Sequence, residues 1–321
     1  MSSSSIFETR AQGKLLLTGE YFVLDGALAL AVPVRFGQSL WVEEGDSVGK
    51  LSWQSQNPDG SIWFEAEFAW PDFQILNTTD ESTAQTLAGI LRACQRQNPF
   101  FFIENQSFRV FTQNDFPREW GLGTSSTLIA ALARWAGVDP YKVLFDTLGG
   151  SGYDIACTYA DGPIFYRLGE GKKPMVARLE VVPPFITHLA NHLYFVFLGK
   201  KQNSREGIAR YRGRVSQNPE IIENISRLTQ QFLAAKTLAE LDSVLLEHEI
   251  IVSETLGLPR AKDLYFNDFW GEVKSLGAWG GDFVLVTSLR SEEETRRYFQ
   301  QKGLAVFLPW REITFGKNEI I

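Results

Sequence analysis

The sequence predicts an α+β protein with two domains. Before residue 70 it consists of short apolar runs separated by turn residues such as Asn57-Pro58-Asp59-Gly60, a pattern typical of strands. Between residues 204 and 256 the apolar residues recur with the period of a helix. The last third alternates strand, helix and strand. A β-rich first half followed by a mixed second half favours the α+β class.

The elements of the first domain follow one another between turns and helix ends. Strands are expected at the apolar runs 15–17, 29–34, 39–42, 51–54, 62–68, 100–103, 107–112, 164–166 and 175–179. Helices are expected at 82–97, 124–136 and 139–148. Gly137 suits the position just after a helix, and Pro140 suits a first helical turn.

A Val-Pro-Pro break at residues 182–184 marks the predicted domain boundary, which divides the chain into domains 1–184 and 185–321. A length of 321 residues is enough to give each domain its own core. The second domain is expected to have strands at 193–198, 283–288 and 305–309, and helices at 204–216, 220–234, 238–256 and 292–302.

The composition excludes several classes of partner. A formal net charge of −7 argues against nucleic acid, which requires a basic face. The longest apolar runs are too short to span a membrane, and residues 1–10 lack the apolar segment of a signal peptide. The only two cysteines, Cys94 and Cys157, suggest neither a disulfide framework nor a metal site. These features predict a cytoplasmic protein with no membrane partner, and they leave its oligomeric state open.

The segment from Pro117 to Thr127 carries the strongest functional signal. It has two glycines, Gly121 and Gly123, which allow backbone N–H groups to line a concave surface at a helix start, where anions are favoured. The predicted phosphate loop comprises Gly121, Leu122, Gly123, Thr124, Ser125 and Ser126. It matches neither a Walker A loop nor the dinucleotide G-x-G-x-x-G pattern. A serine-capped helix after a tight turn is the alternative for this loop taken alone.

A second glycine-rich segment, Gly149-Gly150-Ser151-Gly152-Tyr153-Asp154, opens an apolar, helix-like stretch. Asp154 could orient or deprotonate an acceptor hydroxyl, because phosphoryl transfer depends mostly on positioning and charge neutralisation. The alternative is that Asp154 is a turn or N-cap residue.

A third segment concentrates positive charge at a strand-to-helix junction. Lys200, Lys201 and Arg205 lie within six residues, and Ser204 stands near the expected helix start. Such a junction could bind an anionic substrate. A solvated surface charge cluster is the other interpretation.

Three segments, taken in order, resemble the motifs of the GHMP small-molecule kinases. They are 13–26 (GKLLLTGEYFVLDG), 117–127 (PREWGLGTSST) and 277–283 (GAWGGDF), so the resemblance covers essentially the whole chain. It implies a two-domain GHMP kinase fold, with a β-rich N-terminal α/β domain and a ferredoxin-like C-terminal α+β domain. It also implies ATP and Mg²⁺ as cofactors and a small anionic molecule as substrate.

The resemblance assigns roles to individual residues. It implies that Asp154 is the catalytic aspartate, that Lys14 pairs with it, and that Ser125 contacts the nucleotide-bound Mg²⁺. The loop Gly121–Ser126 would bind ATP. The residues expected to bind or support the substrate are Glu20, Ser151, Gly152, Lys200, Ser204, Arg205, Gly280, Gly281 and Asp282.

Within the superfamily the sequence most resembles phosphomevalonate kinases, because of its Gly-Ser-Gly-Tyr-Asp and Gly-Gly-Asp segments. Glu20 leans toward mevalonate kinase. Two departures stand out: Trp279 replaces a motif glycine, and no glutamate between Thr127 and Gly149 matches the additional Mg²⁺ ligand of mevalonate kinases. Three alternatives therefore stay open: another GHMP kinase, a diphosphomevalonate-decarboxylase-like enzyme, and a GHMP-fold protein that binds a ligand without turnover.

Overall fold

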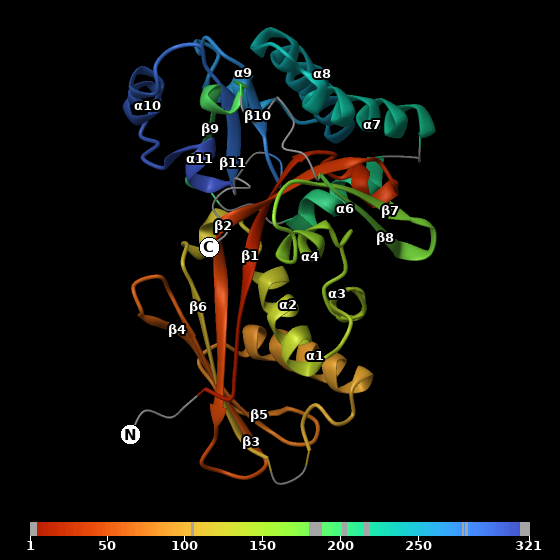
Figure 1. Ribbon diagram of the computed structural model, residues 1–321, viewed down its shortest axis with the longest axis vertical. Coiled ribbons are helices and arrows are strands. Elements are labelled where there is room, and N and C mark those ends of the chain that lie inside the picture. Colours follow the sequence, from red (N-terminus) through yellow and green to blue (C-terminus); the bar gives the residue numbers. More distant parts are fainter. Residues whose placement is uncertain are drawn as a thin grey trace. The chain divides into compact units, whose positions relative to one another are not determined.

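The computed structural model describes residues 5–103, 106–179, 188–200, 204–214, 218–277, 279 and 282–314 (Figure 1). The chain forms two compact units, each discontinuous in sequence. Unit 1 consists of Met1–Gly13, Phe36–Arg118 and Leu122–Tyr159, and unit 2 consists of Lys14–Arg35, Glu119–Gly121 and Ala160–Ile321. The boundary predicted between residues 184 and 185 lies outside the described residues and stays a prediction.

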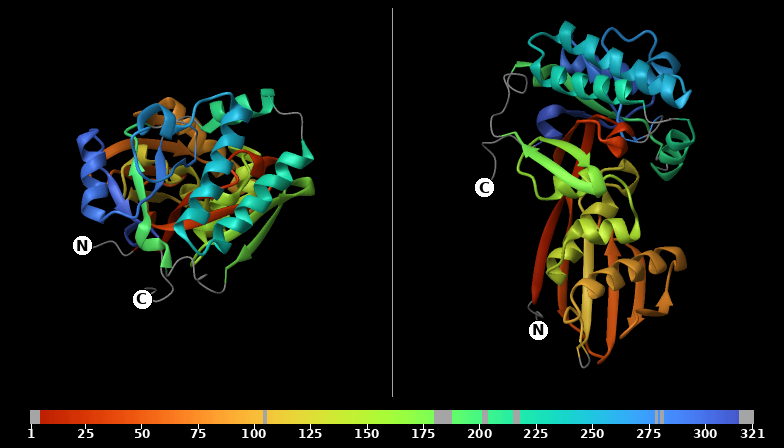
Figure 2. Two further views of the ribbon diagram at one scale, coloured as in Figure 1. Left: turned by 90° about the horizontal axis from the view of Figure 1, so that it is seen from above. Right: turned by 90° about the vertical axis from the view of Figure 1, so that its right-hand side faces the viewer.

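Unit 1 is built on a sheet with the strand order β5-β4-β3-β6-β2, whose neighbours are antiparallel except for the parallel pair β3 and β6. Its strands are β2 (Ala29–Glu44, shared with unit 2), β3 (Lys50–Gln56), β4 (Ile62–Ala69), β5 (Gln74–Thr78) and β6 (Phe108–Asn114). Its helices are α1 (Glu81–Gln97), α2 (Thr124–Ala136), α3 (Pro140–Thr147) and α4 (Tyr153–Thr158). Helix α1 lies along the β4–β5 side of the sheet (Figure 2).

Alternation of apolar and polar residues explains the unit 1 core. Leu51 and Trp53 of β3 point inward, as do Phe108 and Val110 of β6, so every second side chain is buried. Helix α1 begins where the Asp80 side chain accepts a hydrogen bond from the backbone of Thr83. These choices of residue place one apolar face of the sheet against the helices.

Three departures from the prediction fall between residues 29 and 103. Residues 100–103 form a turn and bend instead of a strand, because the side chain of Asn98 binds the Phe100 N–H and its carbonyl binds the Phe101 N–H. The runs 29–34 and 39–42 belong to one long strand, β2. Strand β5 was not predicted, and its exposed, mixed composition gives little apolar alternation to detect.

Unit 2 contains a second sheet, which is antiparallel with the order β10-β11-β9-β12. Its strands are β9 (Leu193–Phe197), β10 (Val273–Ser275), β11 (Phe283–Thr287) and β12 (Phe307–Pro309). Its helices are α6 (Ser204–Arg214), α7 (Pro219–Ala234), α8 (Leu238–Leu256), α9 (Ala261–Tyr265), α10 (Glu292–Gln301) and α11 (Trp310–Ile313). The β-α-β-β-α-β succession with β9 and β11 in the centre is ferredoxin-like, which confirms the predicted class of this part.

Unit 2 also holds the first part of β2, where Ala29–Ala31 pair with β7 (Ile164–Gly169), which in turn pairs with β8 (Lys173–Arg178). Strand β1 (Phe7–Thr18) pairs with β2, and its last five residues belong to unit 2. The remaining short elements are 3-10 helices, η1 (Phe22–Asp25), η2 (Arg118–Trp120), η3 (Glu170–Lys172) and η4 (Ala190–His192).

Burial in unit 2 is concentrated on its central strands. All five residues of β9 and all five of β11 are buried, with Val196 opposite Val284 in register. Helices α7 and α8 run side by side, and α8 packs on β10 (Figure 1). In the part of the chain that the structure describes, no helix combines the length and apolar character needed to cross a membrane.

Candidate active site

The predicted phosphate loop leads into helix α2, as expected. Gly123 is the N-cap of this helix and has a φ of 99°, a left-handed conformation that glycine adopts readily. Leu122 is completely buried and anchors the loop in unit 1, whereas Ser125 is exposed. The Ser126 hydroxyl donates to the Gly123 carbonyl at 2.8 Å, so this proton stays within the loop. The first amides of α2 point out of its N-terminus, where an anion is favoured.

Gly121 and Lys14 come together in unit 2. The Nζ of Lys14 donates to the carbonyl oxygen of Gly121 at 3.1 Å, and only 8% of the lysine is exposed. Gly121 has a φ of 68°, and a Cβ at this position would lie 2.5 Å from Oδ2 of Asp282. A side chain at this position would therefore require the Asp282 carboxylate to move. Both the backbone angle and the close approach of Asp282 favour glycine here.

Asp282 joins the third motif to two other predicted segments. Its backbone N–H donates to the Lys200 carbonyl at 2.7 Å, and its carbonyl accepts from Leu198 N–H at 2.8 Å. Its carboxylate packs on Gly121, and its φ of 50° is unusual for a residue with a side chain. Asp282 therefore lies where the cationic segment, the phosphate loop and the third motif meet. Only 8% of this residue is exposed.

Aromatic contacts hold Trp120, the residue that immediately precedes the loop. Its ring makes an edge contact with Phe283, with centroids 5.7 Å apart, and a second contact with Phe197 at 6.4 Å. These two phenylalanines end β9 and begin β11. Aromatic packing therefore connects Gly121 to the central strands of unit 2.

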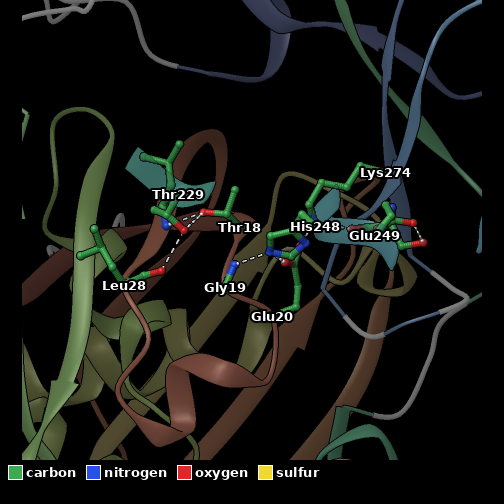
Figure 3. A network of polar contacts seen from close by, with 10 residues as sticks. Thr18, Gly19, Glu20, Leu28, Thr229, His248, Glu249 and Lys274 are labelled. Atoms are coloured by element: carbon green, nitrogen blue, oxygen red, sulfur yellow. Dashed lines mark hydrogen bonds and ion pairs between the residues drawn. The ribbon is translucent and has the colours of Figure 1, made fainter. Parts of the chain in front are cut away.

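The turn after β1 is held by a network of buried polar groups (Figure 3). Gly19 has a φ of 89°, and its N–H donates to Nε2 of His248 at 3.0 Å. The Glu20 carboxylate forms an ion pair with Lys274, whose ammonium also donates to the Ser275 carbonyl at 3.0 Å.

Further hydrogen bonds secure the strand ends beside this turn. The hydroxyls of Thr18 and Thr229 are 2.8 Å apart, and the Thr229 hydroxyl donates to the carbonyl of Leu28 at 2.8 Å (Figure 3). The N–H of Leu30 donates to the Thr18 hydroxyl at 3.1 Å. The first motif is therefore connected to helix α7 through Thr18 and to helix α8 through Gly19.

The electrostatics of the network follow from its burial. Desolvation raises the pKa of the Glu20 carboxyl, an effect that the nearby Lys274 ammonium opposes. Burial also raises the pKa of Glu249 to about 8, and it keeps the pKa of His248 well below its usual value. A neutral His248 accepts the Gly19 N–H at Nε2, so its proton is assigned to Nδ1. The separation of 3.4 Å between Nε2 and Glu20 Oε2 is consequently not an ion pair.

Tyr21 links the first and third motifs. Its hydroxyl accepts the backbone N–H of Trp279 at 2.8 Å, and its ring stacks on Tyr211 of α6 with centroids 5.9 Å apart. Burial raises the pKa of this tyrosine. The Trp279 side chain is 7% exposed, lies in the same apolar cluster and donates its indole N–H to Pro259. The side chain of Trp279, which stands where the motif has a glycine, is thus accommodated inside unit 2.

Asp154 lies in the first turn of α4, in unit 1. The N-cap of this helix is Gly152, with a φ of 91°, so the N-cap alternative for Asp154 is wrong. Asp154 is half-buried, and its carboxylate makes no hydrogen bond or ion pair with any residue that the structure describes. Ser151, just before the N-cap, is 5% exposed. No local structural partner accounts for the aspartate.

The structure brings together only part of the predicted site. Lys14, Gly121, Asp282 and the Lys200 backbone meet within unit 2. Asp154 belongs to unit 1, so its pairing with Lys14 stays a prediction. Ser204 and Arg205 begin α6, and only their backbone is described. Gly280, Gly281 and Lys201 lie outside the described residues.

Sequence reasoning missed the partners of Glu20. His248 and Glu249 interrupt the apolar stripe of α8, and Lys274 stands in the three-residue strand β10. A charged residue among buried neighbours was the available signal, but it does not reveal which distant residue neutralises it.

Unit 1 has a hollow of about 320 Å³ on its sheet, lined by Gln54, Glu65, Asn77, Arg109 and neighbouring residues. None of the predicted site residues lines this hollow.

Comparison with solved structures identifies the fold. The chain is similar to Methanococcus jannaschii mevalonate kinase, with a TM-score of 0.69 and 14% identity over 99% of this chain and 100% of that chain. Streptococcus pneumoniae phosphomevalonate kinase, solved in complex with phosphomevalonate and AMPPNP, gives 0.67 and 14% over 93% and 98%. L. major mevalonate kinase, solved with R-mevalonate, gives 0.62 and 16% over 94% of each chain. No family model and no curated protein matches the sequence itself. The predicted GHMP kinase fold is confirmed.

Proposed function

We propose that this protein is an ATP-dependent small-molecule kinase, similar to phosphomevalonate kinase, that transfers the γ-phosphoryl group of ATP to a mevalonate-pathway metabolite. The acceptor would be a hydroxyl or a phosphate of that metabolite. The contact between Lys14 and the Gly121 carbonyl carries the proposal, because it ties the first motif to the phosphate loop in a chain with this fold.

The donors of the loop fit a polyphosphate. The amides at the α2 N-terminus and the exposed Ser125 hydroxyl would bind ATP phosphates, and Gly121 and Gly123 would allow close backbone approach. Ser125 would contact Mg²⁺, which neutralises phosphate charge when bound. Among the described residues no cluster of three or more His, Cys, Asp or Glu side chains is present, so nucleotide oxygens and water would complete the shell.

The acid–base roles follow from the surroundings of the two charged residues. Asp154 has a carboxylate that no described neighbour occupies, so it is available to orient or deprotonate an acceptor hydroxyl. Lys14 is nearly buried beside the phosphate loop, where its charge would stabilise negative charge that develops during transfer.

The acceptor would be anionic, and the Lys200 segment would bind it. The backbone of Asp282 connects this segment to the third motif, so substrate and nucleotide residues share one support. Glu20 is better assigned a supporting role than a direct contact, because it is 2% exposed and paired with Lys274. The phosphomevalonate complex of the pneumococcal protein provides an analogy for this substrate class.

An ADP-release screen tests the function. Mevalonate, phosphomevalonate, diphosphomevalonate, homoserine and sugars would each be supplied with ATP and Mg²⁺, and we expect turnover with phosphomevalonate or mevalonate. Carbon dioxide release with diphosphomevalonate would instead identify a decarboxylase. Nucleotide binding without turnover on any acceptor would favour the non-catalytic alternative. The burial of Trp279 weakens that alternative, because this side chain packs within unit 2.

A further inference from the structure

Four titratable side chains form a cluster inside unit 2 that the proposed chemistry does not use. Glu20, His248, Glu249 and Lys274, here called the buried charge cluster, are between 0% and 2% exposed. Burying an ion pair such as Glu20–Lys274 is costly, and such a pair is often no more stabilising than apolar residues of the same volume. Burying the polar side chains of His248 and Glu249 beside it also costs stability where hydrogen bonds do not compensate. Stability alone therefore does not explain why four such groups are gathered at one place.

The cluster joins three segments that are far apart in sequence. His248 accepts the Gly19 N–H at 3.0 Å, and Glu20 pairs with Lys274. The neighbour of His248 on α8, Glu249, accepts the backbone N–H of Ser275 at 3.0 Å. Each pair among the Gly19 turn, helix α8 and strand β10 is thus connected directly, and the three connections form a closed triangle.

Two polar atoms of the cluster are left without a hydrogen bond among the described residues. They are Oε2 of Glu20 and Nδ1 of His248, and both are buried. Most buried polar groups in proteins are paired, and an unpaired one costs stability. The cost falls on Glu20 and His248, the two residues that hold the Gly19 turn.

The triangle adjoins the segments that carry Lys14 and Asp282, the two residues that contact Gly121. Lys14 is on the same strand as Thr18, immediately before the Gly19 turn, so the direction of that strand determines where its ammonium lies. Strand β10 ends at Ser275, and Gly277 follows, with a would-be Cβ 3.4 Å from Oδ2 of Asp282. A shift of the Gly19 turn relative to β10 would move Lys14 and Asp282 relative to each other.

We propose that the buried charge cluster is a positioning device, which holds the Gly19 turn and β10 at a fixed spacing and so places Lys14 and Asp282 on Gly121. Because all four members are buried, the proposal gives them no direct contact with nucleotide or substrate. The activity measurement for this inference rests on the proposed kinase function, and a second measurement does not.

The first test removes both charges of the central pair together. In the double variant Glu20→Gln/Lys274→Met the residue volumes are nearly kept and no lone charge remains, whereas either single change strands a buried charge. The matched control is Lys262→Met/Glu272→Gln, a neighbouring lysine–glutamate pair at 3.2 Å beside β10. We expect kcat to fall about 10–100-fold in the first variant, because small misplacements of reacting groups are costly, with the KM for ATP changed less than about twofold. The control should retain wild-type kcat.

A second pair of variants applies if the double variant does not fold. His248→Gln can still accept the Gly19 N–H with its amide oxygen, whereas His248→Leu cannot. We expect His248→Gln to restore most of the kcat that His248→Leu loses. A purely structural role would lower the melting temperature of both variants without separating their kcat values at a temperature where both are folded. Equal kcat values in the two variants, or a folded double variant with wild-type kcat, would overturn the inference.

Hydrogen exchange separates this inference from the proposed function. If the wild-type protein turns over no acceptor, the kinase proposal fails, and the cluster is then judged by amide exchange in peptides that cover residues 14–21 and 118–123. Exchange in both peptides should be at least about tenfold faster in the double variant than in the wild-type protein or the control, because the segments it holds would open more readily. Unchanged exchange would refute the positioning role whatever the activity of the protein.

Discussion

Lys14 donates a hydrogen bond from its Nζ to the carbonyl oxygen of Gly121, 107 positions further along the chain. Only 8% of Lys14 is exposed, so its ammonium group lies beside the loop with little contact with bulk water. In the proposed mechanism its positive charge would act on phosphate oxygens that approach the loop. The carbonyl contact fixes the direction of the ammonium group before any ligand binds, which is the arrangement that electrostatic catalysis requires.

The first prediction concerns Lys14 and Asp154. Asp154→Asn removes the charge and the basic oxygen of the carboxylate, and we expect kcat to fall by about 10²–10⁴ with ATP binding little changed. Lys14→Met should give a comparable loss. The double variant should lose far less than the product of the two, because the residues are expected to act as a unit. Losses that simply multiply would show that they work independently, and near-normal turnover of Asp154→Asn would refute the mechanism.

The second prediction uses two glycines with the same backbone angle. Gly121→Ala and Gly137→Ala both introduce a side chain at a φ close to 67°, since the angles are 68° and 66°. Only at Gly121 does the new Cβ meet an obstacle, the Asp282 carboxylate, whereas nothing lies within 4 Å at Gly137. We expect each to lose about 1–2 kcal/mol from backbone strain. Calorimetry should show that Gly121→Ala alone also loses ATP affinity, by more than about tenfold, and equal affinities would argue against Gly121 as part of the nucleotide loop.

The third prediction concerns the cationic segment. Lys200→Ala and Arg205→Ala should raise the KM for the acceptor much more than the KM for ATP, by about tenfold for a lost charged contact. Lys236→Ala, at an exposed lysine just after helix α7, is the control and should leave both constants unchanged. If the KM for ATP rises instead, these cations belong to the nucleotide site.

The fourth prediction is a pH dependence of stability. The pKa of Glu249 is raised from an ordinary value of 4.5 to about 8 by burial, with Lys274 and Glu20 facing it. Between these two pH values the unfolded chain loses the proton while the folded protein keeps it, so this group destabilises the folded state increasingly as the pH rises. Above about pH 8 both states are ionised, and the loss stops growing.

The measurement is the difference in melting temperature between Glu249→Gln and the wild-type protein. Because glutamine does not titrate, this difference should increase from pH 5 to pH 8 and then level off, and groups such as His248 cancel in it. One kcal/mol corresponds to about 2–4 °C in a domain of this size, so a gain of several degrees is expected at pH 8. A difference that is constant with pH would show that Glu249 is ionised throughout.

Local sequence signals predicted the elements whose ends are determined by their own residues. Helix α2 begins at Gly123 and ends at Gly137, and both glycines adopt the left-handed conformation that the sequence suggested for the second. Helix α8 has the predicted bounds, with Thr237 as N-cap and Gly257 at its end. The three motifs were located for a similar reason, because glycines and short polar residues at fixed spacing reflect local backbone geometry.

Long-range pairing could not be predicted in the same way. Nothing near Glu20 indicates that a lysine 254 residues away neutralises it, because that choice depends on how α8 and β10 pack. Strand β10 has three residues, one of them the buried Lys274, so it shows neither apolar alternation nor length. Residues 100–103 are apolar and β-prone, yet the hydrogen bonds of Asn98 turn the chain there. Tertiary context decides the partner of Glu20 and the position of β10, whereas the turn at residues 100–103 is a local effect of Asn98 that the apolar pattern hides.

The pairing of Glu20 with Lys274 also bears on the order in which the chain can fold. Residues of the first motif emerge early in synthesis, but Thr229 is 211 positions from Thr18, and Lys274 comes later still. Contacts between such distant residues form only after the intervening chain has been made, and closing long loops is slow. The Glu20 carboxylate of the Gly19 turn therefore stays without its lysine partner until most of the chain has been translated. A fragment such as 185–321 synthesised alone would lack this turn altogether, so adding the peptide 14–35 in trans should be needed for it to reach the native state.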